Sequence, residues 1–372
     1  MSAPFGQLPR WVDYGLLPFI NLVVAFLVSG LVVLFIGASP LEAINYMVTG
    51  ALGSGEGLGF TLYYATSFIF TGLSVAVAFH CGLFNIGGEG QVYVGGLGVA
   101  LVALALDRIM PWYVTAPLAA AAGFAFGAAW ALVPAWLQAK RGSHIVITTI
   151  MFNFIAASLM VYLLVNVMKQ PGSMSPQTRL FESGALLPRL GFLFSPLGLD
   201  LGTAPLNVSF FLALASGFLV WVLVWRTRFG YEIRTIGANP TAAAYAGIRY
   251  GRTVVITMLI SGGLAGLMAL NVLLGDHGKL QIEFPSGAGF VGIAVALMGR
   301  SHPVGIVLAA ILFGILYQGG AELAFWVPNI TREMIVLIQG LVILFAGALE
   351  YMFRPALVRL FAPRGAAVLR PA

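Results

Sequence analysis

The chain has 372 residues, of which 60% are hydrophobic and 9% charged, and its mean hydropathy is +0.96. A soluble domain carries about 25% charged residues, so this chain has too few polar side chains to cover a water-exposed surface. The composition therefore excludes a soluble protein and predicts a membrane protein. The net charge of +6 comes from basic residues scattered through short loops, which does not predict nucleic-acid binding.

The sequence lacks the residues that disulfides, cysteine-based metal sites and P-loop ATP binding require. Cys81 is the single cysteine, so neither an intrachain disulfide nor a cysteine-based metal site can form. The four histidines lie far apart in the sequence, without ligand spacing. The chain has no G-x-x-x-x-G-K-[ST] pattern and does not bind ATP through a P-loop of its own. We expect no catalytic residue, no metal site and no cofactor bound by this chain.

Ten apolar runs approach or exceed the length of about 20 residues that a membrane-spanning helix needs. They lie at 14–37, 59–80, 91–107, 112–138, 145–168, 206–225, 253–274, 287–299, 303–319 and 334–353. The first run is longer than a signal-peptide core of about 7–15 residues, and we interpret it as a retained helix. The pattern predicts an all-α, polytopic membrane protein with about ten transmembrane helices in a single domain, 1–372.

The distribution of basic residues predicts how the chain is oriented in the membrane. With a cytoplasmic N-terminus, 13 of the 19 Lys and Arg residues fall on the inside and six on the outside, which follows the positive-inside rule. Both termini are then cytoplasmic, and the protein lies in the cell (inner or plasma) membrane. The inside residues are Arg10, Lys140, Arg141, Arg226, Arg228, Arg234, Arg249, Arg252, Arg300, Arg354, Arg359, Arg364 and Arg370.

The stretch FHCGLFNIGGEGQVYVGG (79–96) places polar residues among glycines, between two apolar runs. An ionisable residue within a span is a functional candidate by default. Glu89 is therefore a candidate substrate-pathway residue, together with Phe84, Asn85 and Gln91. If the following run is a helix, Glu89 lies in its first turn, where the helix dipole stabilises a carboxylate. An equally good interpretation is structural: Glu89 caps the helix, and Asn85 binds backbone groups at a break.

The glycines around Glu89 permit a broken helix, whose free N–H groups would face a cavity and bind a neutral polyhydroxy ligand. Asn153, in the run 145–168, is a further candidate pathway residue. For Asn153 we prefer a structural role as an interhelical hydrogen-bonding residue, which is worth roughly 0.6 kcal/mol on average.

Residues 169–205 form a long outside loop with five prolines. Loops of this length are often functional. A docking surface and an ordinary structural loop are both open interpretations.

The inside loop 226–252 contains a well-specified short helix. Asn239 is a good N-cap, Pro240 fits the first helical position, and Gly247 supplies a left-handed stop after TAAAYA. Such a short helix is marginal in water and needs a surface on which to pack. Lipid headgroups are one such surface. The alanine-rich face favours a groove in a partner protein, because a lipid-bound helix usually presents Trp, Phe or Leu.

At these two stretches the chain resembles the permease subunits of ABC importers in the branched-chain amino acid, simple sugar and nucleoside group. Among these, it looks most like the nucleoside-type permeases that work with a basic-membrane-protein-like lipoprotein. The motifs are GLFNIGGEGQ (82–91), FGYEIRTIGANPTAAAYAGI (229–248), ISGGLAGLMAL (260–270) and GFVGIAVALMGRSHPVGI (289–306). The resemblance covers roughly residues 15–355, and Gly88 departs from it where relatives often have alanine.

The resemblance implies a type-II-like ABC importer permease fold and a nucleoside substrate. It also implies a cytoplasmic ATPase that binds the ATP, a second permease subunit that is often a different chain, and an exported or lipid-anchored substrate-binding protein. The loop between spans six and seven would be the coupling helix that sits on the ATPase. The residues that match it are Arg234, Gly237, Asn239, Pro240, Ala243 and Gly247.

Other functions remain open. A permease for simple sugars or branched-chain amino acids belongs to the same group. An ion-coupled secondary transporter would use Glu89 as its ion site, but the lack of further clear intramembrane acids counts against it. An intramembrane enzyme would need paired Asp residues, a Ser/His pair or an H-E-x-x-H motif, and the chain has no H-E-x-x-H.

Overall fold

The computed structural model describes residues 9, 12–35, 37–327, 330–331, 334–341, 344, 355, 357–358 and 360–361. The described residues form helices joined by loops, with two isolated β-bridges and no strand among them. The chain divides into two compact units, residues 51–318 and residues 1–50 with 319–372. The predicted all-α fold class is confirmed, and the single membrane domain stays a prediction.

The larger unit holds the long apolar helices. They are α3 (Gly55–His80), α4 (Gly88–Leu106), α5 (Trp112–Arg141), α6 (Ile145–Asn166), α8 (Ser209–Arg226), α11 (Tyr250–Ala269) with its π-helical continuation Leu270–His277, and α13 (Pro303–Trp326), which ends in the smaller unit. Shorter helices are α7 (Gly191–Phe194), α9 (Arg228–Ala238), α10 (Pro240–Tyr245) and α12 (Ala288–Met298). The smaller unit holds α1 (Leu17–Phe35) and nearly all of α2 (Pro40–Leu52).

The described residues contain seven helices that are long and apolar enough to cross a membrane, or eight if α1 and α2 form one bent span. The expected ten spans are therefore not confirmed. The run 287–299 gives only the 11-residue α12, about 17 Å long, against the roughly 30 Å of a bilayer core. Most of the run 334–353, and both termini, lie outside the described residues.

Several helices begin and end at capping residues that the sequence contains. Ser54 caps α3 by accepting a hydrogen bond from the Gly57 amide at 3.0 Å. Pro111 precedes α5, and Gly142, with φ of +65°, ends it in the left-handed conformation. The sequence did not predict α2 or a separate α9, because neither forms a long apolar run.

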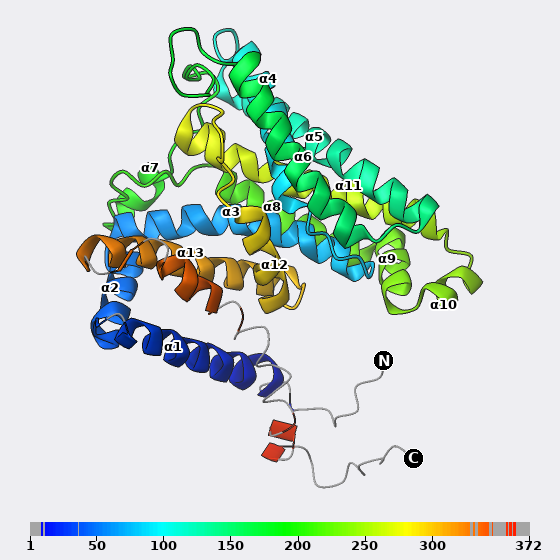
Figure 1. Ribbon diagram of the computed structural model, residues 1–372, viewed down its shortest axis with the longest axis horizontal. Coiled ribbons are helices and arrows are strands. Elements are labelled where there is room, and N and C mark those ends of the chain that lie inside the picture. Colours follow the sequence, from blue (N-terminus) through cyan, green and yellow to red (C-terminus); the bar gives the residue numbers. More distant parts are fainter. Residues whose placement is uncertain are drawn as a thin grey trace. The chain divides into compact units, whose positions relative to one another are not determined.

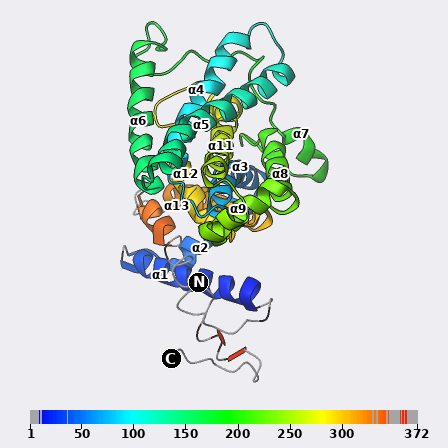
Figure 2. The same cartoon turned by 90° about the vertical axis from the view of Figure 1, so that its right-hand side faces the viewer.

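Helix α11 lies in the middle of the larger unit, with α5 on one side and α3 on the other (Figure 2). It approaches α5 closely, because glycines meet where the helices cross. A Cβ atom on Gly266 would overlap the Gly123 carbonyl, and one on Gly127 would overlap the Gly262 carbonyl. Small residues allow this close backbone approach in membrane helix pairs.

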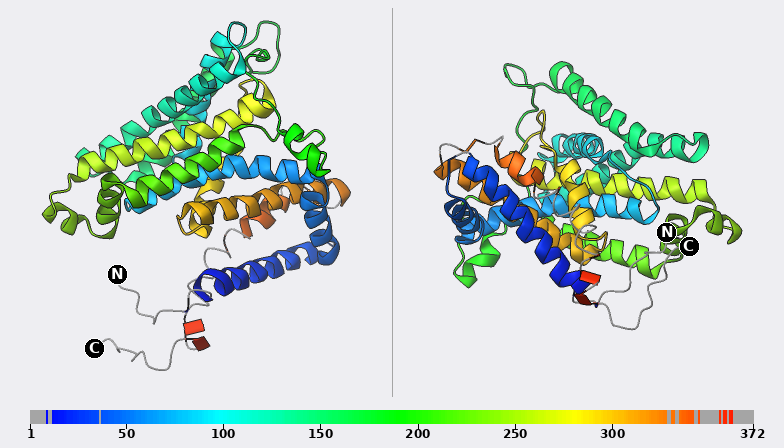
Figure 3. Two further views of the ribbon diagram at one scale, coloured as in Figure 1. Left: turned by 180° about the vertical axis from the view of Figure 1, so that it is seen from behind. Right: turned by 60° about the horizontal axis from the view of Figure 1, so that its bottom comes forward.

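The long helices of the larger unit lead to two different ends. At one end α8 and α11 run into α9 and α10, and at the other lie α7 and the chain before it (Figures 1 and 3). Eight of the 13 basic residues of this unit lie at the α9–α10 end, with Glu232 as the only acidic residue among them. These eight are Lys140, Arg141, Arg226, Arg228, Arg234, Arg249, Arg252 and Arg300.

The glycine contact between α5 and α11 gives a stability prediction. Gly266→Val should lower the free energy of unfolding by roughly 1–3 kcal/mol, because the added side chain overpacks a closed contact. Apparent melting temperature in detergent micelles measures the effect. The matched control is Gly217→Ala on α8, where a Cβ atom would lie 3.9 Å from Leu73. Equal melting temperatures for both variants would contradict this packing.

Candidate functional site at the α3–α4 break and the α9–α10 pair

The chain between α3 and α4 turns back into the protein, and Asn85 holds this turn. Its side chain is fully buried. Its Oδ1 accepts from the Gly87 amide at 2.9 Å and from Gln91 Nε2 at 3.2 Å. Its Nδ2 donates to Gln91 Oε1 at 3.0 Å and to Ser261 Oγ of α11 at 2.8 Å. Asn85 and Gln91 thus form a closed amide pair at the start of α4.

Asn153 of α6 binds the same turn from the other side. Its Oδ1 accepts from the Gly90 amide and its Nδ2 donates to the Ile86 carbonyl, each at 2.9 Å. Asn153 lies eight residues along α6 from Ile145, which is about 12 Å. The break therefore lies within the helix bundle, where backbone groups must find partners in the protein.

Glu89 lies in the first turn of α4, as the sequence predicted, but it caps a different helix. Its Oε1 accepts from the Gly287 amide at 2.9 Å and its Oε2 from the Gly289 amide at 2.8 Å. These are amides at the N-terminus of α12, where a carboxylate is stabilised by the helix dipole. The side chain therefore joins the starts of α4 and α12. The Gly88 and Gly289 backbones are also close neighbours there.

The structure brings together four of the five predicted pathway residues, namely Asn85, Glu89, Gln91 and Asn153. All four are buried. The fifth, Phe84, stacks on Phe79 with ring centroids 5.1 Å apart and lines a cavity nearer the α9–α10 end. Two of the free N–H groups expected at the break are bonded, the Gly87 amide to Asn85 and the Gly90 amide to Asn153. Pathway contact by the five residues stays a prediction.

A second buried polar cluster centres on Asn271, which is not among the residues predicted from the sequence. Its Oδ1 accepts from Asn207 Nδ2 at 2.9 Å and from Ser209 Oγ at 3.0 Å. Its Nδ2 donates to the Tyr63 carbonyl at 3.0 Å and to Ser67 Oγ at 2.9 Å. Asn271 is the second residue of the π-helical continuation Leu270–His277, and π-helical turns are frequent at functional sites. In the sequence, the feature that could have identified Asn271 is its position as a polar residue within the apolar run 253–274.

Helix α10 forms where the sequence predicted it. Asn239 Oδ1 accepts from the Thr241 and Ala242 amides at 2.9 and 3.1 Å. Gly247 has φ of +77°, and the Ile248 amide bonds the Ala243 carbonyl at 3.0 Å, which closes the helix in a Schellman motif. Ala243 is its only buried residue, and Tyr245 is 91% exposed.

Helix α9 fixes α10 to the body of the larger unit. Ile233, Ile236 and Ala243 share one buried cluster with residues of α3, α5 and α11 and of the α3–α4 turn. Gly237 packs directly on the His80 carbonyl at the end of α3. Arg234 is exposed, and its Nε donates to the Gly230 carbonyl at 3.4 Å. The six predicted coupling residues therefore lie together on α9, α10 and the turn that follows.

At the opposite end, the loop 169–205 folds back on the helices. Asp107, after α4, accepts from both terminal nitrogens of Arg179 at 2.7 and 2.9 Å and from the Glu182 amide at 2.9 Å. Burial raises the pKa of Asp107, and these hydrogen bonds outweigh it, so its pKa lies below the ordinary value. The Asp107 side chain is 1% exposed.

The comparisons decide the family. A family model described as "Branched-chain amino acid transport system / permease component" matches residues 57–347. The chain belongs to this permease family. The permease is a multi-pass membrane protein and a transport subunit, not an enzyme, and the resemblance to ABC importer permeases is confirmed.

Three relatives align along nearly the whole permease. A glucose ABC transporter permease protein of Haloferax volcanii is 33% identical and covers 94% of this chain and 91% of the relative. A nucleoside ABC transporter permease protein of Lactococcus lactis is 32% identical and covers 89% of this chain and 90% of the relative. A guanosine ABC transporter permease protein of Bacillus subtilis is 33% identical and covers 90% of this chain and 93% of the relative. No solved structure is significantly similar to this chain.

The contacts of Glu89 with α12 give a stability prediction. Glu89→Ala leaves one buried and one partly buried amide unpaired, and should destabilise the permease by roughly 1–3 kcal/mol for the buried one and by less for the other. Glu89→Gln keeps one acceptor and should lose less. Thermal unfolding in micelles ranks the variants, with Glu182→Gln, whose side chain is 55% exposed, as the control. If Glu89→Ala unfolds at the wild-type temperature, the carboxylate does not hold α12.

The pairing of Asp107 with Arg179 gives a pH prediction. The folded-state pKa of Asp107 is lowered, so its stabilisation is present above the unfolded pKa, about 3.9, and is lost as pH falls further. Asp107→Asn should therefore lower the melting temperature at neutral pH, and the difference from wild type should shrink below about pH 4. Adding Arg179→Gln to Asp107→Asn should change little. A pH-independent difference would argue against a charged pair.

Proposed function

We propose that this permease forms the membrane pathway of an ABC importer for nucleosides and couples it to a cytoplasmic ATPase. The observation that carries the proposal is the α9–α10 pair. Helix α10 is capped at both ends, buries only Ala243, and exposes its other five residues. An isolated helix this short is marginal in water, so a partner surface explains its exposed alanines.

The α9–α10 pair is built so that a movement of α10 is transmitted to the helix bundle. Its outer helix is exposed, and α9 is anchored through Ile233 and Ile236 in the cluster that includes Leu83 of the α3–α4 turn. A force on α10 therefore reaches the turn that Asn85 and Asn153 hold. ATP is bound by the ATPase in this scheme, and the permease needs no cofactor. Arg234, Gly237, Asn239, Pro240, Ala243 and Gly247 form the coupling element.

The distribution of basic residues supports the orientation. The α9–α10 end holds eight basic residues and one acidic residue among those described, and Lys and Arg favour the cytoplasmic side. That end faces the cytoplasm in the proposed arrangement, and the membrane is the cell membrane. The loop 169–205 then faces an exported or lipid-anchored binding protein. A second permease subunit, the same or a different chain, completes the pathway.

The polarity of the helices supports an uncharged solute. Within the larger unit, Glu89 is the only Asp, Glu, Lys or Arg among the described helices that lies away from both ends. A charged substrate would need counter-charges at membrane depth. Four relatives are named for nucleosides or guanosine, and we therefore favour nucleosides over sugars or amino acids. Four buried side chains would shape the pathway by fixing where α4 and α12 begin, namely Asn85, Glu89, Gln91 and Asn153. Phe84 is the fifth proposed pathway residue.

Uptake of radiolabelled guanosine and uridine by cells with and without this chain tests the proposal. Uptake should require the chain, fall when ATP is depleted with the proton gradient intact, and be competed by nucleosides. Competition by glucose or leucine alone would move the permease to another substrate class of its family. Uptake that survives ATP loss but needs the gradient would favour a secondary transporter.

Variants of α10 test the coupling. Ala244→Asp changes an exposed position and should reduce uptake at least tenfold, because it places a charge in the partner surface. Protein levels and melting temperature should stay at wild-type values. Ala244→Ser, which adds no charge at the same position, is the matched control and should transport normally. Normal uptake by Ala244→Asp would remove α10 from the coupling surface.

A further inference from the structure

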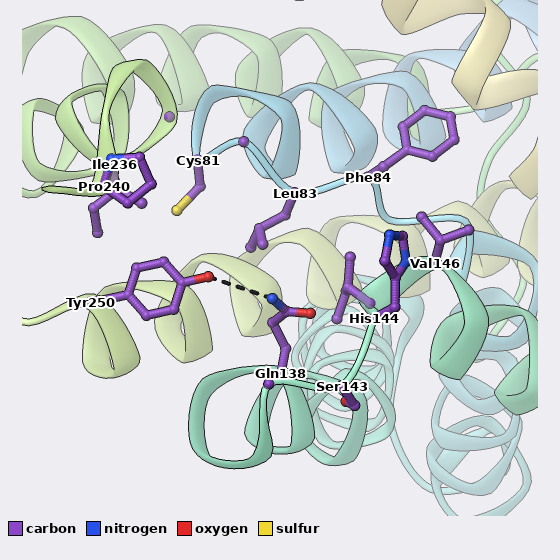
Figure 4. A pocket seen from close by; sticks show the side chains of 14 residues that line it. Cys81, Leu83, Phe84, Gln138, Ser143, His144, Val146, Ile236, Pro240 and Tyr250 are labelled. Carbon is purple, nitrogen blue, oxygen red and sulfur yellow. Dashed lines mark hydrogen bonds between the residues drawn. The ribbon is translucent and has the colours of Figure 1, made fainter.

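A cavity of about 470 Å³ lies beneath the α9–α10 pair. Figure 4 shows its walls, which come from the α3–α4 turn, the end of α5, the start of α6, the α9–α10 junction and Tyr250 of α11. Its size falls within the roughly 300–1,000 Å³ of small-molecule sites. Because residues of the pair and of the helix bundle both line it, an occupant would contact both.

Two polar groups of this cavity have no partner among the described residues. Gln138 Oε1 and Ser143 Oγ are buried and accept or donate no hydrogen bond. The other end of the Gln138 amide, Nε2, donates to the Tyr250 hydroxyl at 3.5 Å. A buried polar group without a partner costs about 1–3 kcal/mol. Both atoms are covered by neighbouring protein atoms. A ligand would therefore donate to Gln138 Oε1 after the side chain turns toward the cavity, and this hydrogen bond would relieve the cost.

The opposite walls are apolar and partly aromatic. Leu83, Phe84, Val146, Ile236 and Pro240 line them, and Phe84 is held in place by its stack on Phe79. Burial raises the pKa of the Cys81 thiol, also in the wall, to about 11, so it offers no thiolate near neutral pH. The lining suits a flat heterocycle with an N–H donor on one edge.

Basic residues flank the cavity along the chain. Lys140 and Arg141 directly precede the lining residue Gly142, and Arg249 directly precedes Tyr250, and all three are exposed. They belong to the end of the unit at which basic residues outnumber acidic ones eight to one among those described. An anionic group on the ligand would therefore be attracted to the rim of the cavity.

We propose that this cavity binds a nucleoside monophosphate on the cytoplasmic side. The base lies between the apolar walls with an N–H toward Gln138 Oε1, and the phosphate lies toward Lys140, Arg141 and Arg249. A bound nucleotide holds α9–α10 against the bundle and slows import. This regulatory part rests on the proposed function, because phosphorylation of an imported nucleoside yields a ligand of this class.

Equilibrium dialysis of the purified permease in detergent micelles, with radiolabelled AMP, GMP or UMP, tests the binding without ATPase or transport. At least one nucleotide should bind, more tightly than its nucleoside or inorganic phosphate. Gln138→Leu should weaken binding about threefold to tenfold, since it removes one hydrogen bond. Arg141→Gln should weaken binding and reduce its dependence on salt. Gln170→Leu and Lys169→Gln, at the opposite end, are the matched controls and should bind normally.

Ser143→Phe fills the cavity and should abolish binding, and melting temperature checks that each variant is folded. Unchanged binding to folded Ser143→Phe, or no nucleotide binding by the wild type at millimolar concentration, overturns the inference. The two proposals fail separately. Nucleoside uptake without nucleotide binding removes only the cavity site, whereas nucleotide binding without nucleoside uptake removes only the substrate assignment and its regulation.

Discussion

The larger unit depends on the pairing of backbone groups where α3 gives way to α4 inside the helix bundle. A broken helix exposes N–H and C=O groups, and in a membrane these must be satisfied by the protein. Asn85 does this from within the break, Asn153 from α6, and Glu89 serves the equally exposed start of α12. The three side chains fix two interrupted helices at one place.

This arrangement gives Glu89, the carboxylate within the described part of the helix bundle, a structural role. A lone intramembrane acid suggests an ion site, but Glu89 has both oxygens bonded to amides at a helix N-terminus. Its charge is balanced by the dipole of α12 rather than by a cation. The same bonds hold α12, which is too short to span a membrane, against the start of α4. The geometry accounts for a charged residue at this depth without proton or sodium chemistry.

The α3–α4 break and the α9–α10 pair pack directly on each other. Leu83 of the break shares an apolar cluster with Ile236 of α9, and Gly237 touches the last turn of α3. A displacement of α10 must therefore move the start of α4 or be absorbed by the cavity beneath α9. Packed interiors respond to small shifts by switching between arrangements rather than by continuous deformation. An occupied cavity would remove the space for such a shift.

The sequence by itself determined the membrane class, the runs that became α3 to α6, α8 and α11, and the position of α10. These follow from composition and from local signals such as Asn239, Pro240 and Gly247, which act within a few residues of themselves. It also placed Glu89 in the first turn of α4. Its resemblance to ABC importer permeases pointed to the family.

Only the tertiary structure decided what the polar side chains bind. The partners of Glu89 lie 198 and 200 residues away, and Asn153 meets a turn more than 60 residues earlier. Such pairings depend on helix crossings that no local pattern encodes, including the close approach of Gly127 to Gly262. The short α12 and the cavity under α9 arise in the same way, because they exist only once distant helices have packed.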